Sequence, residues 1–364
     1  MSLTLRVDGE AWREHLRRTA ERVPGLVPVA KGNGYGFTLP RLARKAQWLS
    51  EQRPHERGLD ERGSGVDTIA VGTYEELDAV AGRYHGDLLV LTPWRPFVDP
   101  LGPRLGRRVI HTVGRLEDLT GLLDRDPDAR LVLERRTSML RHGFTARDLR
   151  TAGGMLRERS RRTLAGVALH LPLNQGSHLA EMERMLTDIV GAELGTSTVW
   201  VSHLTAEELA RLQAAYPDFT FRPRVGTDLW LGVRSALQVT STVLDVHAVE
   251  RGEAFGYRGR SAPKAGHLLV VSGGTAHGIG LESPTGDTSL RARAATVARG
   301  GLDAVGFVRS PFSIGGKQRL FAEPPHMQAS MLFLPSGAPL PAVGEEVDVR
   351  VRFTATTFDR IYVS

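Results

Sequence analysis

The 364-residue sequence contains no cysteine, so it has no disulfide, no thiolate metal ligand and no cysteine nucleophile. No apolar run reaches the roughly 18 residues that a membrane-spanning helix needs, which excludes a transmembrane protein. Residues 1–18 contain no apolar segment typical of a secretory signal peptide. With no cysteine to oxidise, these absences favour a cytoplasmic protein with no membrane partner.

Lysine is also scarce. Only four of the 47 basic residues are lysines, namely Lys31, Lys45, Lys264 and Lys317. A lysine retained in such an arginine-rich chain points to chemistry that arginine cannot perform, above all formation of a Schiff base. The net charge of +6 comes from arginines scattered along helical segments rather than clustered, so we expect no nucleic-acid partner.

Short β-branched runs recur between stretches of helical periodicity. Nearly continuous apolar runs of this length are typical of parallel strands buried on both faces. The eight runs cover residues 26–31, 68–72, 87–91, 108–113, 130–134, 164–170, 197–203 and 219–225. They predict an α/β fold with a closed (β/α)8 TIM barrel over residues 1–234, with an open doubly wound sheet as the alternative. Polar, glycine-rich residues 51–66 predict a surface loop within one βα repeat.

The pattern changes after about Val233. From there the chain shows strand-like segments separated by glycine and proline turns, with few helical stretches. Residues 235–364 therefore predict a second, smaller β-rich domain.

Polar residues gather where the predicted barrel strands end, which is where barrel enzymes carry their chemistry. These residues are Lys31, Glu134, His170, His203 and Arg224, with Arg141 a few positions after a strand. Lys31 precedes the segment GNGYG, whose glycines permit close approach of a ligand and whose Tyr35 can bond a phosphate. Gly226 and Thr227 follow the eighth run, a frequent position for a phosphate-binding turn. Each residue alone has an ordinary structural interpretation, and only the combination predicts a site.

Taken together, these segments resemble the fold-type III, pyridoxal-phosphate-dependent alanine racemases. VPVAKGNGYGF is similar to the family signature around its Schiff-base lysine, and IAVGTYEELDAV resembles its second βα unit. RRTSMLRHGF resembles the family's D-T-G-M-x-R-x-G-F segment. The resemblance covers about the first 235 residues well and about the last 130 weakly.

The resemblance implies pyridoxal 5′-phosphate as cofactor, with Lys31 as its Schiff-base lysine and no metal. The other cofactor contacts that it implies are Tyr35, His170, His203, Arg224, Gly226 and Thr227. Arg141 and Met327 would contact the substrate. Arg224 would face the ring nitrogen and, being always protonated, would leave that nitrogen uncharged, which suits racemisation over side reactions.

Glu134 occupies a special position within this resemblance. In the family, a carbamylated lysine often lies seven residues before the arginine that corresponds to Arg141, and its anion orients that guanidinium. Glu134 places a true carboxylate there, so we expect it to bond Arg141 directly.

The C-terminal part departs from the family at its second catalytic base. The family carries a tyrosine in a motif like G-Y-A-D-G, whereas residues 274–278 read GTAHG and place Thr275 at the tyrosine position. A threonine hydroxyl has too high a pKa to act as a base unaided. His277 has a suitable pKa and would share a face with Thr275 on an extended strand. We therefore expect catalysis to involve Lys31, His277 and Thr275.

These features predict an amino-acid racemase that acts on a small amino-acid substrate. The resemblance further implies a homodimer with the site at the subunit interface. Two alternatives remain: another fold-type III enzyme, such as a lyase or decarboxylase, which loss of the tyrosine favours, and a non-catalytic pyridoxal-phosphate-binding protein. The well-known carriers of this fold are single barrels, so the extra β-domain argues against the second alternative.

Overall fold

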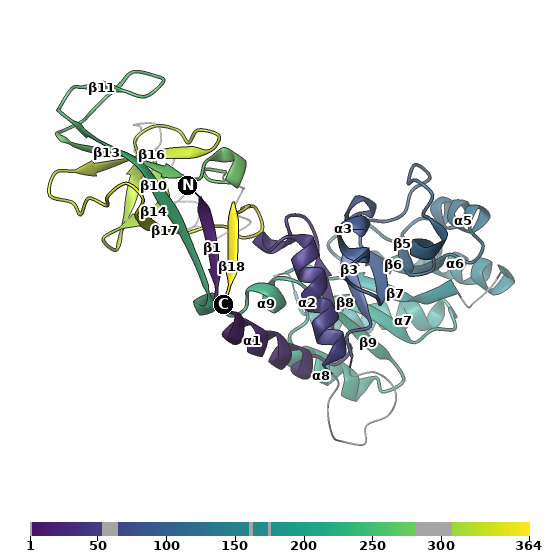
Figure 1. Ribbon diagram of the computed structural model, residues 1–364. Helices are drawn as coiled ribbons and strands as arrows, with labels where there is room; N and C mark the ends of the chain where they lie inside the picture. Colours follow the sequence, from purple (N-terminus) through teal and green to yellow (C-terminus); the bar gives the residue numbers. More distant parts are fainter. Residues whose placement is uncertain (1, 53–64, 160–162, 174–175, 282–307) are drawn as a thin grey trace. The chain divides into compact units, whose positions relative to one another are not determined.

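The structure is a computed structural model that describes residues 2–52, 65–159, 163–173, 176–281 and 308–364. The chain forms two compact units, which are considered separately. We call residues 13–232 the barrel unit, and residues 1–12 together with 233–364 the β-unit. Figure 1 traces both along the sequence. Most of the surface loop predicted at residues 51–66 lies outside the described residues.

The barrel unit contains a closed barrel of eight parallel strands, which confirms the predicted TIM barrel. Each strand lies within one of the eight apolar runs or extends it by a single residue. The strands are β2 (Val27–Ala30), β3 (Thr68–Val71), β4 (Asp87–Val90), β5 (Val109–Val113), β6 (Arg130–Arg135), β7 (Leu164–His170), β8 (Thr198–Ser202) and β9 (Thr220–Val225).

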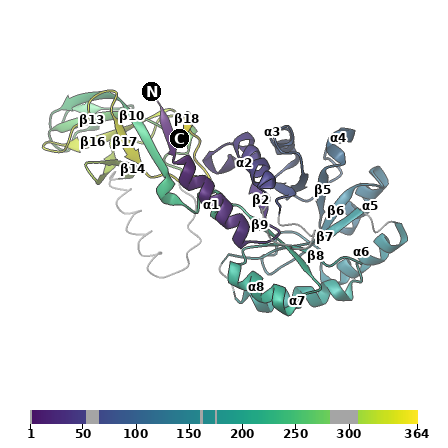
Figure 2. The ribbon, with the colours of Figure 1, turned by 60° about the horizontal axis from the view of Figure 1, so that its bottom comes forward.

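Helices surround these strands in the barrel unit (Figure 2). They are amphipathic, as α5 illustrates by burying Leu119, Leu122 and Leu123 along one stripe. The helices are α1 (Gly9–Arg22), α2 (Leu39–Glu51), α3 (Leu77–Ala81), α4 (Pro103–Gly106), α5 (Leu116–Arg125), α6 (Ala146–Arg159), α7 (His178–Gly191), α8 (Ala206–Ala215) and α9 (Thr227–Leu231). No helix among the described residues combines the length and apolarity needed to cross a membrane.

The interior of the barrel explains why polar residues meet at one end. Its core cluster consists of Val27, Val29, Ala70, Leu89, Ile110, Val132, Ala168 and Trp200. Side chains alternate along a strand, so the residue two positions after a core residue faces the same way. This rule turns Lys31, Glu134, His170 and Ser202 inward, one layer closer to the carboxyl ends of the strands. The polar side chains of the candidate site therefore form the layer that follows the apolar core inside the barrel.

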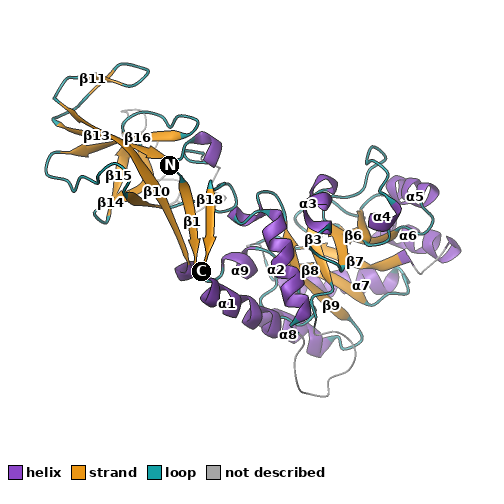
Figure 3. Ribbon diagram, in the orientation of Figure 1, coloured by secondary structure: helices purple, strands orange, loops and turns teal. Residues whose placement is uncertain are grey.

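The β-unit is built on an antiparallel sheet with one parallel edge pair, which confirms the predicted C-terminal β-domain. Figure 3 shows that strands and loops make up most of it. The order is β13-β16-β15-β14-β17-β10-β1-β18, and β13 also pairs with β10. The strands are β1 (Leu3–Val7), β10 (Leu237–Val249), β13 (Gly266–Ser272), β14 (Arg309–Ile314), β15 (Lys317–Phe321), β16 (Ala329–Pro335), β17 (Glu346–Val349) and β18 (Arg360–Val363), with β11 (Ala254–Phe255) and β12 (Arg260–Ser261) as a separate hairpin.

Strand β1 belongs to this sheet although it lies near the start of the sequence. It pairs antiparallel with β10, where Leu5 opposes Val239, and parallel with β18, where Leu5 opposes Ile361. Residues 1–12 therefore group with residues 233–364, whereas the sequence analysis placed them with the barrel. The other boundary, predicted after residue 234, lies after residue 232 in the structure.

Candidate active site

Lys31 follows β2 directly and begins a tightly turned loop at the mouth of the barrel. Five of the residues 32–38 adopt left-handed backbone angles, and two of them, Tyr35 (φ 54°) and Thr38 (φ 72°), are not glycine. Such conformations cost free energy in non-glycine residues and are concentrated at functional sites. The loop therefore has the properties of a ligand-binding segment rather than of an ordinary connection.

The amine of Lys31 lies in an environment that disfavours its charged form. Partial loss of solvent lowers the pKa of Lys31, and the positive charges of Arg141 and Arg224 lower it further. Glu76 acts in the opposite direction. A larger fraction of the amine is therefore unprotonated and nucleophilic than in a lysine without these neighbours.

Tyr35 and Gly226, which the sequence analysis assigned to a phosphate site, lie against each other. A Cβ atom on Gly226 would come within 2.1 Å of the Tyr35 hydroxyl oxygen, so only glycine leaves room for this phenol. Burial raises the pKa of Tyr35 to about 12, which keeps its hydroxyl protonated as a hydrogen-bond donor. Thr227 follows Gly226 directly, is exposed and begins α9.

His170 and His203 also lie together. Their ring centroids are 5.0 Å apart in an edge-to-face arrangement, and Nδ1 of His170 shares a 2.8 Å hydrogen bond with the Ser202 hydroxyl. Burial, reinforced by the positive charges of Arg224 and Arg141, lowers the pKa of His170 to about 3. The pKa of His203 is also lowered by burial and by Arg224. The lowered pKa values favour the neutral form of both rings.

Arg224 is buried at the end of β9. Its Nη2 donates a 2.9 Å hydrogen bond to the Leu169 carbonyl, and within the described chain its buried Nε has no partner. Burial lowers the pKa of Arg224 to about 10, while the carboxylate of Glu134 opposes this shift. The guanidinium remains charged at neutral pH, and its unused N–H can donate to a ligand acceptor.

Glu134 lies in the same inward-facing layer but does not make the predicted bond to Arg141. Burial raises the pKa of Glu134, whereas the charges of Arg224 and Arg141 lower it. Neither a hydrogen bond nor an ion pair joins Glu134 to Arg141 in the described part of the chain. The reason is that Glu134 is 4% exposed inside the barrel, while Arg141 is exposed on the loop that follows the left-handed Leu140.

Glu76 belongs to this site and was missed by the sequence analysis. Its Oε1 accepts a 2.7 Å hydrogen bond from the Gly32 N–H, and its Oε2 accepts a 2.6 Å bond from the Gly72 N–H. Two adjacent glutamates follow β3, and only the three-dimensional course of the turn shows that Glu76, rather than the exposed Glu75, faces Lys31.

The proposed catalytic pair in the β-unit is arranged differently from the expectation. Residues Thr275–His277 form a 3-10 turn instead of an extended strand, so the two side chains do not share a face, and the premise for their joint action is wrong. Thr275 is exposed, whereas His277 is buried. The Gly274 N–H donates to Nδ1 of His277 at 3.3 Å, which leaves the proton on Nε2, 3.1 Å from Asp359. His277 thus has both ring nitrogens engaged within the fold.

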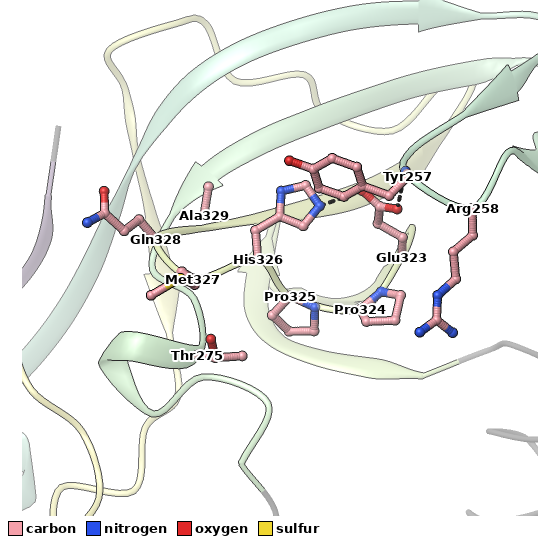
Figure 4. A pocket seen from close by; sticks show the side chains of 10 residues that line it. All are labelled: Tyr257, Arg258, Thr275, Glu323, Pro324, Pro325, His326, Met327, Gln328 and Ala329. Carbon is pink, nitrogen blue, oxygen red and sulfur yellow. Dashed lines mark hydrogen bonds and ion pairs between the residues drawn. The ribbon is translucent and has the colours of Figure 1, made fainter.

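Thr275 and Met327 nevertheless line one pocket of about 740 Å³ in the β-unit (Figure 4). Its wall also contains a histidine held by a buried carboxylate. Nε2 of His326 lies 2.6 Å from Oε1 of Glu323, which is 2% exposed, and the ring of Tyr257 lies 4.8 Å from the His326 ring. The sequence analysis did not identify this pair, because it lies in an irregular proline-containing segment. In the described ranges, no group of three His, Asp or Glu side chains is placed to hold a metal ion.

Comparison with known proteins identifies the family. Residues 7–204, more than half of the chain, match the sequence profile of a family described as alanine racemase, N-terminal domain. The protein belongs to this family. A comparison with curated protein sequences found no match.

Solved structures of alanine racemases share the fold over the whole chain. Alanine racemase from Bartonella henselae, a structure with covalently bound pyridoxal phosphate, is 16% identical with a TM-score of 0.70, and 100% of each chain is covered. The biosynthetic alanine racemase from Pseudomonas aeruginosa is 20% identical with a TM-score of 0.65, covering 97% of this chain and 91% of the other. At these identities the likeness establishes the fold of alanine racemase.

Proposed function

We propose that this protein is a pyridoxal-phosphate-dependent racemase of small α-amino acids. The observation that carries the proposal is the lowered pKa of the Lys31 amine. This amine lies at the mouth of the barrel, where the charge of Arg224 acts on it. Membership of the alanine racemase family and the cofactor in the Bartonella henselae structure support the choice of cofactor. The family resemblance alone supports a homodimer, which a measurement of mass in solution tests.

The residues present fit this cofactor. The buried Nε of Arg224 has no partner within the described chain, so it can donate to an uncharged pyridine nitrogen. Tyr35, Gly226 and Thr227 offer a protonated hydroxyl, a position without a side chain and an exposed threonine for a phosphate. Lys31 supplies the amine.

Bound pyridoxal phosphate supplies an electron sink that weakens the α C–H bond of an amino acid. The Lys31 amine would take the α-proton on one face and return it there. Arg224, which keeps its proton at neutral pH, would limit how far the ring withdraws electrons. The exposed guanidinium of Arg141 would bind the substrate carboxylate.

Racemisation also requires a proton donor and acceptor for the opposite face. Thr275 lacks a suitable pKa, and His277 has both ring nitrogens engaged. Within the β-unit, Glu323 orients the ring of His326 through Nε2, and Nδ1 of His326 has no hydrogen bond to the described residues. Engagement of His277 also favours the alternative of a lyase or decarboxylase, for which a single base suffices.

Exchange of the α-proton tests the proposal. The protein loaded with pyridoxal phosphate is incubated in deuterium oxide with L- and D-alanine and then with a panel of other amino acids, and both label and chirality are determined. We expect label with inversion, and loss of both in Lys31→Arg, which keeps the charge without a usable amine. Label with retention, or release of carbon dioxide or an elimination product, would replace racemisation by one of the alternatives. No label with any substrate would leave a cofactor-binding protein.

A further inference from the structure

One carboxylate joins the ends of two neighbouring strands at the barrel mouth. Glu76 accepts the N–H of Gly32 on one oxygen at 2.7 Å and the N–H of Gly72 on the other at 2.6 Å. Gly32 directly follows Lys31, and Gly72 directly follows β3. Glu76 therefore ties the first residue of the Lys31 loop to the adjacent strand.

The Glu76 carboxylate and the Lys31 side chain both pack closely against Gly72. A Cβ atom on Gly72 would lie 3.1 Å from Cβ of Lys31 and 3.0 Å from Oε2 of Glu76. Gly32 has a φ of 60°, a left-handed angle that other residues rarely adopt. The loop that carries Lys31 thus begins with a backbone conformation suited to glycine, and the Glu76 bond holds it at this first residue.

Glu76 also supplies the negative charge that acts on the Lys31 amine. Loss of solvent, Arg141 and Arg224 all lower the pKa of Lys31, and Glu76 raises it. Glu134, a buried carboxylate at this end of the barrel, interacts instead with Arg224 and Arg141. An amine that must both accept and release a proton needs a pKa between these extremes.

We propose that Glu76 is a positioning residue for Lys31, which fixes the start of the lysine loop and balances the cationic surroundings of the amine. This inference rests on the proposed function in one respect, namely that Lys31 is the reactive amine.

The scarcity of lysine makes the proposal testable without cofactor or substrate. The full chain, free of pyridoxal phosphate, is treated briefly with an acetylating ester across a range of pH, and acetylation of each lysine is measured by mass spectrometry. Only the unprotonated amine reacts, so each lysine gives its own titration profile. The exposed Lys264 and Lys317 serve as internal references.

We expect Glu76→Gln to move the Lys31 profile to lower pH and to leave both reference profiles in place. Glu75→Gln is the matched control, because it removes the same charge from the exposed neighbouring residue and should leave all profiles unchanged. A purely structural role predicts the opposite direction. Loosening the loop would admit water, and because burial lowers the pKa of Lys31, its profile would move to higher pH.

An unchanged Lys31 profile in Glu76→Gln, or a shift to higher pH, would therefore overturn the proposal. If this variant does not fold, Glu76→Asp keeps the charge beside Lys31, and its profile should coincide with that of the wild type. A displacement to lower pH in Glu76→Asp would contradict the role assigned to the charge.

The outcome is independent of the proposed function. A shifted acetylation profile in a protein that exchanges no α-proton would support the role of Glu76 while rejecting racemisation. An unshifted profile in an active racemase would support racemisation while rejecting the role of Glu76.

Discussion

Burial also changes the titration of a residue that is not one of the proposed site residues. His111 lies on β5 with 5% of its surface exposed, and its Nδ1 shares a 2.9 Å hydrogen bond with the Tyr74 hydroxyl. Burial lowers the pKa of His111 to about 4. The folded protein thus holds this ring neutral at pH values where an unfolded chain would protonate it.

This property predicts how stability depends on pH. At pH values between the ordinary histidine pKa of about 6.5 and the lowered pKa of His111, the ring binds a proton in the unfolded state but not in the folded state. The free energy of unfolding therefore falls as pH falls through this range. The contribution of neutral His111 is complete above this window, and roughly 2 kcal/mol of it is lost by pH 5. The destabilisation caused by His111→Asn should therefore shrink by about that amount between pH 7.5 and pH 5.

Urea unfolding at the two pH values measures this change. His247→Asn is the control, because the His247 side chain is 56% exposed. An equal destabilisation by His111→Asn at pH 7.5 and pH 5 would show that folding does not lower the pKa of this ring, so that it is protonated in the folded protein at pH 5.

Residue identity alone indicated part of the site. Lys31 and Arg224 stand out in the sequence because they are charged residues at the ends of apolar strands, and Tyr35 because it lies in the glycine-rich segment after Lys31. The bonds of Glu76 were not predictable, since two adjacent glutamates look equivalent in a sequence. Nor was the engagement of His277, which depends on Asp359, a residue 82 positions away.

At the scale of elements, the eight barrel strands were predictable because strands buried on both sides read as continuous apolar runs. The turn at residues 275–277 was not, because a 3-10 turn of three residues has no periodicity that separates it from a strand. The contact between the Lys31 loop and the turn after β9 could not be predicted from the sequence either. It joins segments about 190 residues apart through Tyr35 and Gly226.

A methyl group at Gly226 tests that contact. Gly226→Ala should displace the buried Tyr35 phenol and reduce the free energy of unfolding by about 1–3 kcal/mol. Removing the hydroxyl with Tyr35→Phe should relieve part of the clash, so Gly226→Ala should cost less in that background.

Chemical unfolding of the two single variants and the double variant gives the comparison. Gly82→Ala is the matched control, because a Cβ there meets no atom within 4 Å and φ is −78°, and it should change stability by no more than about 0.5 kcal/mol. Equal costs of Gly226→Ala with and without the Tyr35 hydroxyl would rule out the predicted clash.

At the scale of the whole molecule, the sequence order and the spatial order differ at β1. The segment LTLRV reads as an ordinary strand, and nothing in its five residues says which sheet it joins. Its neighbours, β10 and β18, begin more than 230 residues later, so only the folded chain reveals that β1 lies between them.

A core substitution in β1 should therefore act at the far end of the sequence. Leu5 is fully buried, and Leu5→Ala should cost about 2–5 kcal/mol. Hydrogen exchange followed by mass spectrometry should show faster exchange in peptides from β10 and β18 than in the wild type, with a smaller change in β2–β9. Arg6→Gln, at a half-exposed position on the same strand, should change little. Faster exchange confined to the barrel strands would refute the assignment of β1.

The position of β1 has a consequence for biosynthesis. A ribosome that adds about 5–20 residues per second makes β1 on the order of ten seconds or more before β10 and β18 are complete. During that interval the intervening residues 13–232 emerge and can form their barrel, while the apolar Leu3, Leu5 and Val7 still lack strand partners. An unpaired strand is prone to pair with other chains. The nascent protein thus exposes an unpaired apolar strand while residues 13–232 are made, and chaperones that shield short apolar segments should raise its yield.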